Sequence, residues 1–121
     1  MKYSISVICL LVCFNLCYGQ RLKTPTLSPF SKISQQVGLT EVTLQYSRPS
    51  AKGRVVFGEL VPYDKVWRTG ANRATRITFK EVAKIGGKTI QPGEYAIYTI
   101  PRENRWTIII HANTSLRSIA G

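Results

Sequence analysis

The chain has 121 residues, a length that suits one domain and excludes two of full size. Seventeen lysines and arginines against six acidic residues give it a formal net charge of +11. The basic residues are spread along the chain without a run of four, and no nucleic-acid-binding motif accompanies them. We therefore interpret the charge as a basic surface and expect no nucleic-acid partner.

The N-terminal residues have the layout of a secretory signal peptide. Lys2 supplies a positive end, an apolar run extends from Ile5 to about Tyr18, and Gly19 is a small residue at the exit. The apolar run is shorter than the roughly 20 residues that a membrane-spanning helix needs. We expect cleavage after residue 19, no transmembrane segment after cleavage, and an exported bacterial protein in the periplasm or outside the cell.

All three cysteines, Cys9, Cys13 and Cys17, lie inside this apolar run. Their four-residue spacing would suit a metal stripe on a helix, but no histidine or acidic residue lies beside them. Leu16 is not the small residue usually found before a lipid-anchored cysteine. We interpret the cysteines as small apolar residues of the leader, so the mature chain offers neither a disulfide nor a thiol nucleophile.

A flexible lead-in is expected over residues 20–31, and a β-domain over residues 32–121. Within Thr40–Tyr46 apolar and polar residues alternate, the period-2 pattern of a strand with one buried face. Lys32–Val37 is a weaker strand candidate that would pair with it as a hairpin.

The next stretch, Tyr46–Phe79, is rich in glycine, arginine and aromatic residues. Pro49 disfavours helix at the residue before it, and glycines allow backbone conformations closed to other residues. Val55–Phe57 and Val66–Arg68 are candidate short strands, and the rest is a long loop. Its apolar and aromatic content argues against disorder, and long loops in compact domains tend to be functional.

Five further strand-like runs follow: Thr75–Lys80, Val82–Ile85, Lys88–Ile90, Glu94–Ile100 and Trp106–His111. Gly86-Gly87 suits a two-residue hairpin turn. The last run is apolar on both faces, which predicts burial on both sides. No stretch has helical periodicity, so we predict an all-β fold, an antiparallel β-sandwich. Because no closing strand follows the last run, we also expect C-terminal truncation, with the domain only partly contained in residues 32–121.

Several motifs, in order over roughly residues 29–111, are shared with a known family. They are Tyr46-Ser47-Arg48-Pro49-Ser50, Lys52-Gly53-Arg54, Phe57-Gly58, Leu60-Val61-Pro62-Tyr63, Val66-Trp67-Arg68-Thr69-Gly70-Ala71-Asn72, Ala74-Thr75, Ile77-Thr78-Phe79, Gly87-Lys88, Pro92-Gly93-Glu94-Tyr95-Ala96, Thr99-Ile100-Pro101 and Trp106-Thr107. On these residues the chain resembles the bacterial family catalogued as domain of unknown function 2911. The resemblance implies an exported β-rich domain that continues for several more strands, and it implies no reaction.

Cationic, amide and aromatic side chains of the stretch Tyr46–Phe79 form the candidate ligand-binding set. These residues are Arg48, Lys52, Arg54, Tyr63, Trp67, Arg68 and Asn72. Guanidinium groups bind carboxylate or phosphate as a fork, and Trp and Tyr offer flat stacking faces, so the ligand would be anionic or carbohydrate-like. The alternative is structural: aromatic rings fill the core and arginines bond loop carbonyls. We favour it for Trp67 and leave both interpretations open for Arg68 and Asn72.

Catalysis has weaker support in the sequence. His111 is the single histidine and lacks metal-ligand spacing, Glu59 and Asp64 are typical of solvated loop acids, and no Gly-x-Ser-x-Gly motif occurs. We expect no catalytic residue, metal or cofactor. The leading hypothesis is a non-enzymatic exported binding domain. The alternatives are a cell-envelope hydrolase with part of its site beyond residue 121, and a structural or assembly module without a small ligand.

Overall fold

The computed structural model describes residues 22–116, so the expected leader at residues 1–19 and its cysteines lie outside the described residues. Within this range the secondary structure consists of strands alone. They are β1 (Phe30–Val37), β2 (Thr40–Ser47), β3 (Thr75–Phe79), β4 (Ala83–Ile85), β5 (Lys88–Ile90), β6 (Gly93–Pro101) and β7 (Trp106–His111). None of these residues belongs to a helix long and apolar enough to cross a membrane. The all-β prediction is confirmed.

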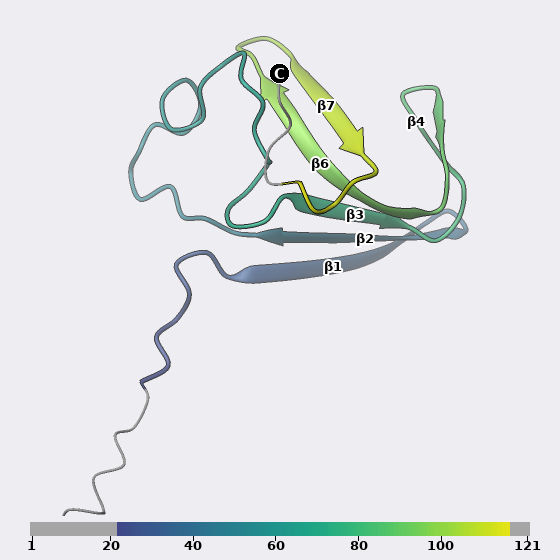
Figure 1. The fold of residues 1–121 in the computed structure, drawn as a ribbon, viewed down its shortest axis with the longest axis horizontal. Helices are drawn as coiled ribbons and strands as arrows, with labels where there is room; N and C mark the ends of the chain where they lie inside the picture. The colour runs from purple at the N-terminus through teal and green to yellow at the C-terminus, as the bar shows by residue number, and fades with distance from the viewer. Residues whose placement is uncertain (1–21, 117–121) are drawn as a thin grey trace, which may run out of the picture.

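Five strands form one antiparallel sheet in the order β1-β2-β3-β6-β7, and β4 pairs with β5 in a separate two-stranded sheet. Figure 1 shows the long connection between β2 and β3 at one end of the larger sheet and the β4 hairpin at the other. We call this connection, residues 48–74, the central segment. The two antiparallel sheets fit a sandwich, and the expected hairpin of β1 with β2 is confirmed.

The strand register divides the larger sheet into two chemically different faces, because residues directly opposite in an antiparallel pair share a face. On one face Leu44 lies opposite Ile77, and Ile77 lies opposite Tyr95. We call this the apolar face. On the other face Tyr98 lies opposite Ile109. We call this second face the pocket face.

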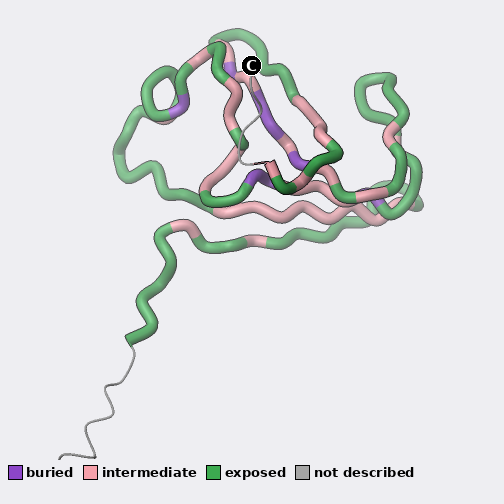
Figure 2. Tube along the Cα trace, viewed as in Figure 1, coloured by how far each residue is buried: buried purple, intermediate pink, exposed green. Residues whose placement is uncertain are grey.

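The buried residues gather on β6, as Figure 2 shows, whereas β1 is exposed along almost its whole length. The core cluster consists of Ala74, Ala96 and Tyr98, and the last two are fully inaccessible to solvent. Val66 of the central segment and Ile109 of β7 pack against this cluster. The central segment and the sheet therefore share one core on the pocket face.

Three local predictions are wrong. Val55–Phe57 and Val66–Arg68 form no strands; each contributes only a single residue to an isolated bridge, Phe57 with Val61 and Trp67 with Thr99. The last strand is not buried on both sides, since Ile108 is 66% exposed. The physical reason is position: within residues 22–116, β7 pairs only with β6, and Ile108 on the apolar face is left largely open to solvent.

Candidate ligand-binding site

The central segment is anchored to β6 where β3 stops. The pairing of β3 with β6 begins at Thr75 opposite Ile97, which leaves the last residues of β6 without that neighbour. Trp67 fills the gap: its N–H donates to the carbonyl of Thr99 at 2.7 Å, and the Thr99 N–H donates back at 2.8 Å. These bonds satisfy backbone groups that burial would otherwise leave unpaired. They fix the part of the central segment around Trp67 against the sheet.

A tight loop precedes this anchor. The N–H of Val61 donates to the Val56 carbonyl at 2.7 Å, and the N–H of Gly58 donates to the Val61 carbonyl at 2.9 Å. Gly58 has φ +93°, and a Cβ there would lie 3.0 Å from the Tyr63 ring. Tyr63 thus packs against a backbone position that only glycine fits well.

A strained corner follows the anchor at Thr69-Gly70. Thr69 is β-branched yet has φ +55°, which is a costly conformation for such a residue. Two buried threonines hold it: the Thr99 hydroxyl lies 3.0 Å from the Thr69 hydroxyl, and the Thr75 hydroxyl donates to the Thr69 carbonyl. Because Arg68 directly precedes the corner, these bonds also fix the backbone position from which the Arg68 side chain extends.

Between the central segment and β6 lies a cavity of about 730 Å³, which we call the main cavity. Its lining is Pro49, Ser50, Ala51, Arg54, Val56, Leu60, Val61, Pro62, Lys65, Val66, Trp67, Arg68, Gly70, Ala71 and Tyr98. Three of these residues are cationic and none is acidic. A volume between about 300 and 1,000 Å³ is typical of small-molecule sites.

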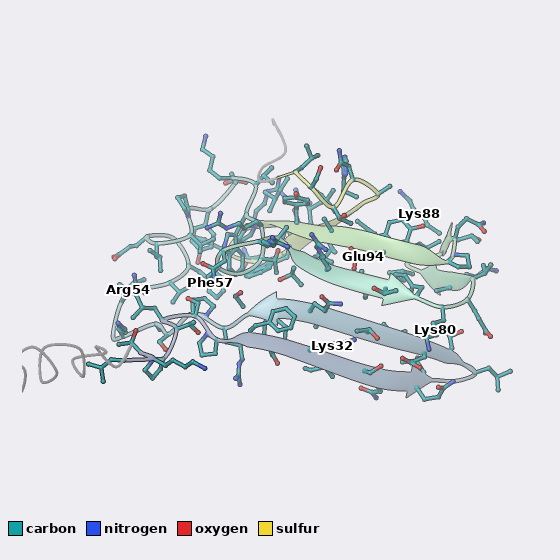
Figure 3. All side chains as sticks on the ribbon, turned by 60° about the horizontal axis from the view of Figure 1, so that its bottom comes forward. Lys32, Arg54, Phe57, Lys80, Lys88 and Glu94 are labelled. Atoms are coloured by element: carbon teal, nitrogen blue, oxygen red, sulfur yellow. The ribbon has the colours of Figure 1, made fainter. Side chains whose placement is uncertain are left out.

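The three cationic side chains of the main cavity differ in the hydrogen bonds that they already make within the protein. Arg54 donates from Nε to the Ala51 carbonyl and from Nη2 to the Ser50 carbonyl, both at 2.9 Å. It therefore shapes the loop, as the structural alternative expected. Figure 3 shows Arg54 at the end of the sheet far from Lys80 and Lys88. Lys65 and Arg68 are exposed and make no side-chain hydrogen bond or ion pair with any residue in 22–116, so both are available to a ligand.

The predicted ligand-binding residues are divided among several places. Arg54, Trp67 and Arg68 line the main cavity, whereas Asn72 lines a second cavity of about 200 Å³ and donates to the Ser47 hydroxyl at 3.3 Å. Neither cavity is lined by Arg48, Lys52 or Tyr63.

Trp67 also belongs to an aromatic cluster with Phe57 and Trp106. Its ring centroid lies 6.1 Å from that of Phe57 and 6.3 Å from that of Trp106, and all three rings meet edge to face. Phe57 and Trp106 are 41% and 44% exposed, so the cluster lies at the surface. Edge-to-face contacts of this kind stabilise the fold. They add a structural role to the place of Trp67 in the cavity wall.

Most lining residues of the main cavity are absent from the predicted set, and two of them, Lys65 and Tyr98, carry polar groups that bear on the site. Lys65 lies in the predicted stretch but is absent from the predicted set, which contains the neighbouring lysine Lys52 instead. Tyr98 comes from β6 and is fully buried, and its hydroxyl donates to the Leu116 carbonyl at 2.7 Å. The sequence placed Tyr98 only within the strand-like run Glu94–Ile100. No local pattern connects it with the central segment.

The acidic and histidine candidates do not line the main cavity. Asp64 accepts a 2.6 Å hydrogen bond from Nε of Arg102, and Glu59 is exposed; neither lines the main cavity or the second cavity. Nδ1 of His111 accepts from the Asn113 N–H at 3.0 Å. Across the described part of the chain, no group of three His, Cys, Asp or Glu side chains is placed to hold a metal ion.

Comparison with known proteins gives a family and no activity. The family model described as "Protein of unknown function (DUF2911)" matches residues 28–119. This match confirms the resemblance found over roughly residues 29–111. No curated protein and no solved structure matches the chain.

Proposed function

Because the chain belongs to the DUF2911 family, whose function is unknown, we propose a function from the site itself. The protein is a non-enzymatic binding domain that takes an anionic or carbohydrate-like ligand in the main cavity. The proposal includes an exported location, periplasmic or extracellular, which rests on the leader expected in residues 1–19.

One observation carries the proposal: Arg54, Lys65 and Arg68 line a single cavity to which no acidic residue contributes. Cations facing one space without a counter-charge favour an anion, and a guanidinium group binds carboxylate or phosphate as a fork. Lys65 and Arg68 have no side-chain partner among the described residues, so an anion would gain their hydrogen bonds without breaking others.

Equilibrium binding to a panel of small anions and sugars tests this proposal, with isothermal titration calorimetry as the measurement. The panel contains glucuronate, glucose 6-phosphate, maltose and dodecanoate. For a member that binds, we expect Arg68→Ala to weaken affinity about tenfold or more, because a hydrogen bond to a charged group contributes roughly 1.5–3 kcal/mol.

Arg48→Ala is the matched control, since Arg48 is an exposed arginine of the same segment that lines neither cavity. It removes one positive charge and should leave affinity nearly unchanged. Equal losses in the two variants would point to the general positive field of the protein, and the proposed site would then be wrong. Failure of every panel member to bind would count against the binding function.

A further inference from the structure

We infer that the ligand is an amphipathic anion, with one carboxylate or phosphate head on an apolar body. This inference rests on the proposed function and narrows it. It chooses between the anionic and carbohydrate-like classes from the chemistry of the cavity lining.

The walls of the main cavity are mainly apolar. The apolar side chains include Val56, Leu60, Val61, Pro62, Val66 and Tyr98. Val61 and Tyr98 are buried, whereas Leu60 is exposed, so the apolar lining extends from the solvent to the core. An apolar ligand chain would be removed from water along this lining, and each buried methylene should strengthen binding by about two- to fourfold.

The two lining cations that have no side-chain partner within residues 22–116 lie at the solvent side of the same cavity. Lys65 and Arg68 are both exposed, whereas Tyr98, which lines the same cavity, is fully buried. A ligand would therefore place its charged head against these two side chains, where water completes its solvation, and its apolar body toward Tyr98. The opposite orientation would bury the charge without a partner, which is strongly unfavourable.

The lining does not suit a sugar. No Asp, Glu, Asn or Gln side chain lines the main cavity, and its hydroxyl groups are those of Ser50 and Tyr98. The Tyr98 hydroxyl already donates to Leu116, and the carbonyls of Ser50 and Ala51 already accept from Arg54. A ligand with many hydroxyls would lose water on entering and find few acceptors, and unpaired buried hydroxyls are costly.

The test is a calorimetric series on the purified protein, with every amphiphile kept below its micelle-forming concentration. Dodecanoate, octanoate and acetate vary the tail on one head, and dodecyl phosphate changes the head on one tail. Dodecyl maltoside keeps the tail but has no charge, and glucose 6-phosphate keeps a charge on a sugar. We expect dodecanoate to bind at one site at least about tenfold more tightly than octanoate, with acetate, dodecyl maltoside and glucose 6-phosphate weaker still.

Four variants locate the binding. Lys65→Ala and Arg68→Ala should each weaken dodecanoate binding by about tenfold, and Arg48→Ala should not. Ile108→Ser changes an exposed residue of the apolar face and should also leave binding unchanged. If dodecyl phosphate binds more tightly than dodecanoate, the site takes phosphate heads; the reverse result assigns carboxylate heads, and either agrees with the inference.

Other outcomes would overturn the inference in distinguishable ways. Binding of glucose 6-phosphate or acetate as tight as that of dodecanoate, lost in Arg68→Ala, would disprove the amphipathic ligand and keep the proposed function. Dodecanoate binding that survives Arg68→Ala but is lost in Ile108→Ser would place it on the apolar face, and the inference would be wrong. No binding by any member of the series would overturn both proposals.

Discussion

The larger sheet and the central segment keep their shapes by different means. In the strands, regular antiparallel pairing satisfies the backbone, and no residue other than glycine has a left-handed conformation. Among residues 22–116 all four non-glycine residues with positive φ lie in the central segment: Lys52, Asp64, Thr69 and Asn72. The difference teaches that local pattern sets the strands, whereas contacts distant in sequence hold the central segment in conformations its residues would otherwise avoid.

Most of those distant contacts are made by one strand. Beyond the Trp67–Thr99 pair, the N–H of Asp64 donates to the Pro101 carbonyl at 3.0 Å, and Val66 packs against the Tyr98 cluster. Strand β6 is therefore both the best-buried strand of the sheet and the support of the main cavity. Changes at this junction should affect both regions, whereas changes confined to one region should not.

The largest effect is expected from Tyr98→Ala, which breaks the junction itself. Tyr98 is fully buried, so truncation leaves a cavity in the shared core and should lower the free energy of unfolding by about 3–5 kcal/mol. Tyr98→Phe keeps the ring and removes only the hydroxyl bond to Leu116, so about 1 kcal/mol is expected. Urea denaturation followed by circular dichroism measures both. Similar losses in the two variants would mean that the ring does not fill the core.

An intermediate effect is expected at the strained corner. Gly70 has φ +148°, and a Cβ there would meet the Thr75 hydroxyl oxygen at 3.2 Å, so Gly70→Ala should cost about 2–3 kcal/mol. Gly53 is the control, because it has φ +72° and open space around its Cβ position. Gly53→Ala should lower the free energy of unfolding by about 1 kcal/mol, because alanine would only have to adopt a left-handed backbone conformation there. Thermal or urea unfolding measures the loss of stability in both variants. Equal losses in Gly70→Ala and Gly53→Ala would show that the contact with Thr75 does not constrain the corner.

The smallest effect is expected in the sheet, at the hairpin end far from the cavity. Lys80 donates to Glu41 at 2.9 Å and Ser34 donates to it at 2.7 Å. The bond from Lys80 first, and then that from Ser34, holds the pKa of Glu41 below its ordinary value of 4.5. A depressed folded-state pKa stabilises the fold above the unfolded-state pKa, and this contribution is lost as pH falls through the folded value.

Glu41→Gln should therefore reduce the loss of stability between pH 7 and about pH 3, measured as the shift of the urea midpoint. Glu59→Gln is the control, because Glu59 is an exposed acid with no side-chain partner among the described residues. It should change the pH dependence less than Glu41→Gln does. A Glu41→Gln protein with the wild-type pH dependence would refute the link between this ion pair and stability.

The same contrast decides how much the sequence could predict. The alternation in Thr40–Tyr46 and Thr75–Lys80 placed two neighbouring strands correctly, because strand pairing follows a local period of two. The valines of Val55–Phe57 suggested a strand, but hydrogen bonds from Val61 and Leu60 back to Val56 and Val55 fold this run into a tight loop instead. The hydrogen bonds of this loop overrode the strand propensity of the valines there.

The site was foreseen as a region and not as a set of residues. Composition pointed to the central segment, which does line the main cavity. It could not tell Arg68, which lines the cavity, from Arg48, which does not, because their difference depends on the anchor at Thr99. Tyr98 was outside any local argument for the same reason.

The central claim is that the cations anchored by β6 bind an anion, and an amide ¹H–¹⁵N correlation titration with dodecanoate tests it most directly. The account predicts progressive, saturable shifts for the amides of Arg68, Gly70 and Ala71 beside the main cavity, with those of Lys32 and Gln36 on β1 unmoved. Saturable shifts confined to the sheet, or none in the central segment at millimolar ligand, would contradict it.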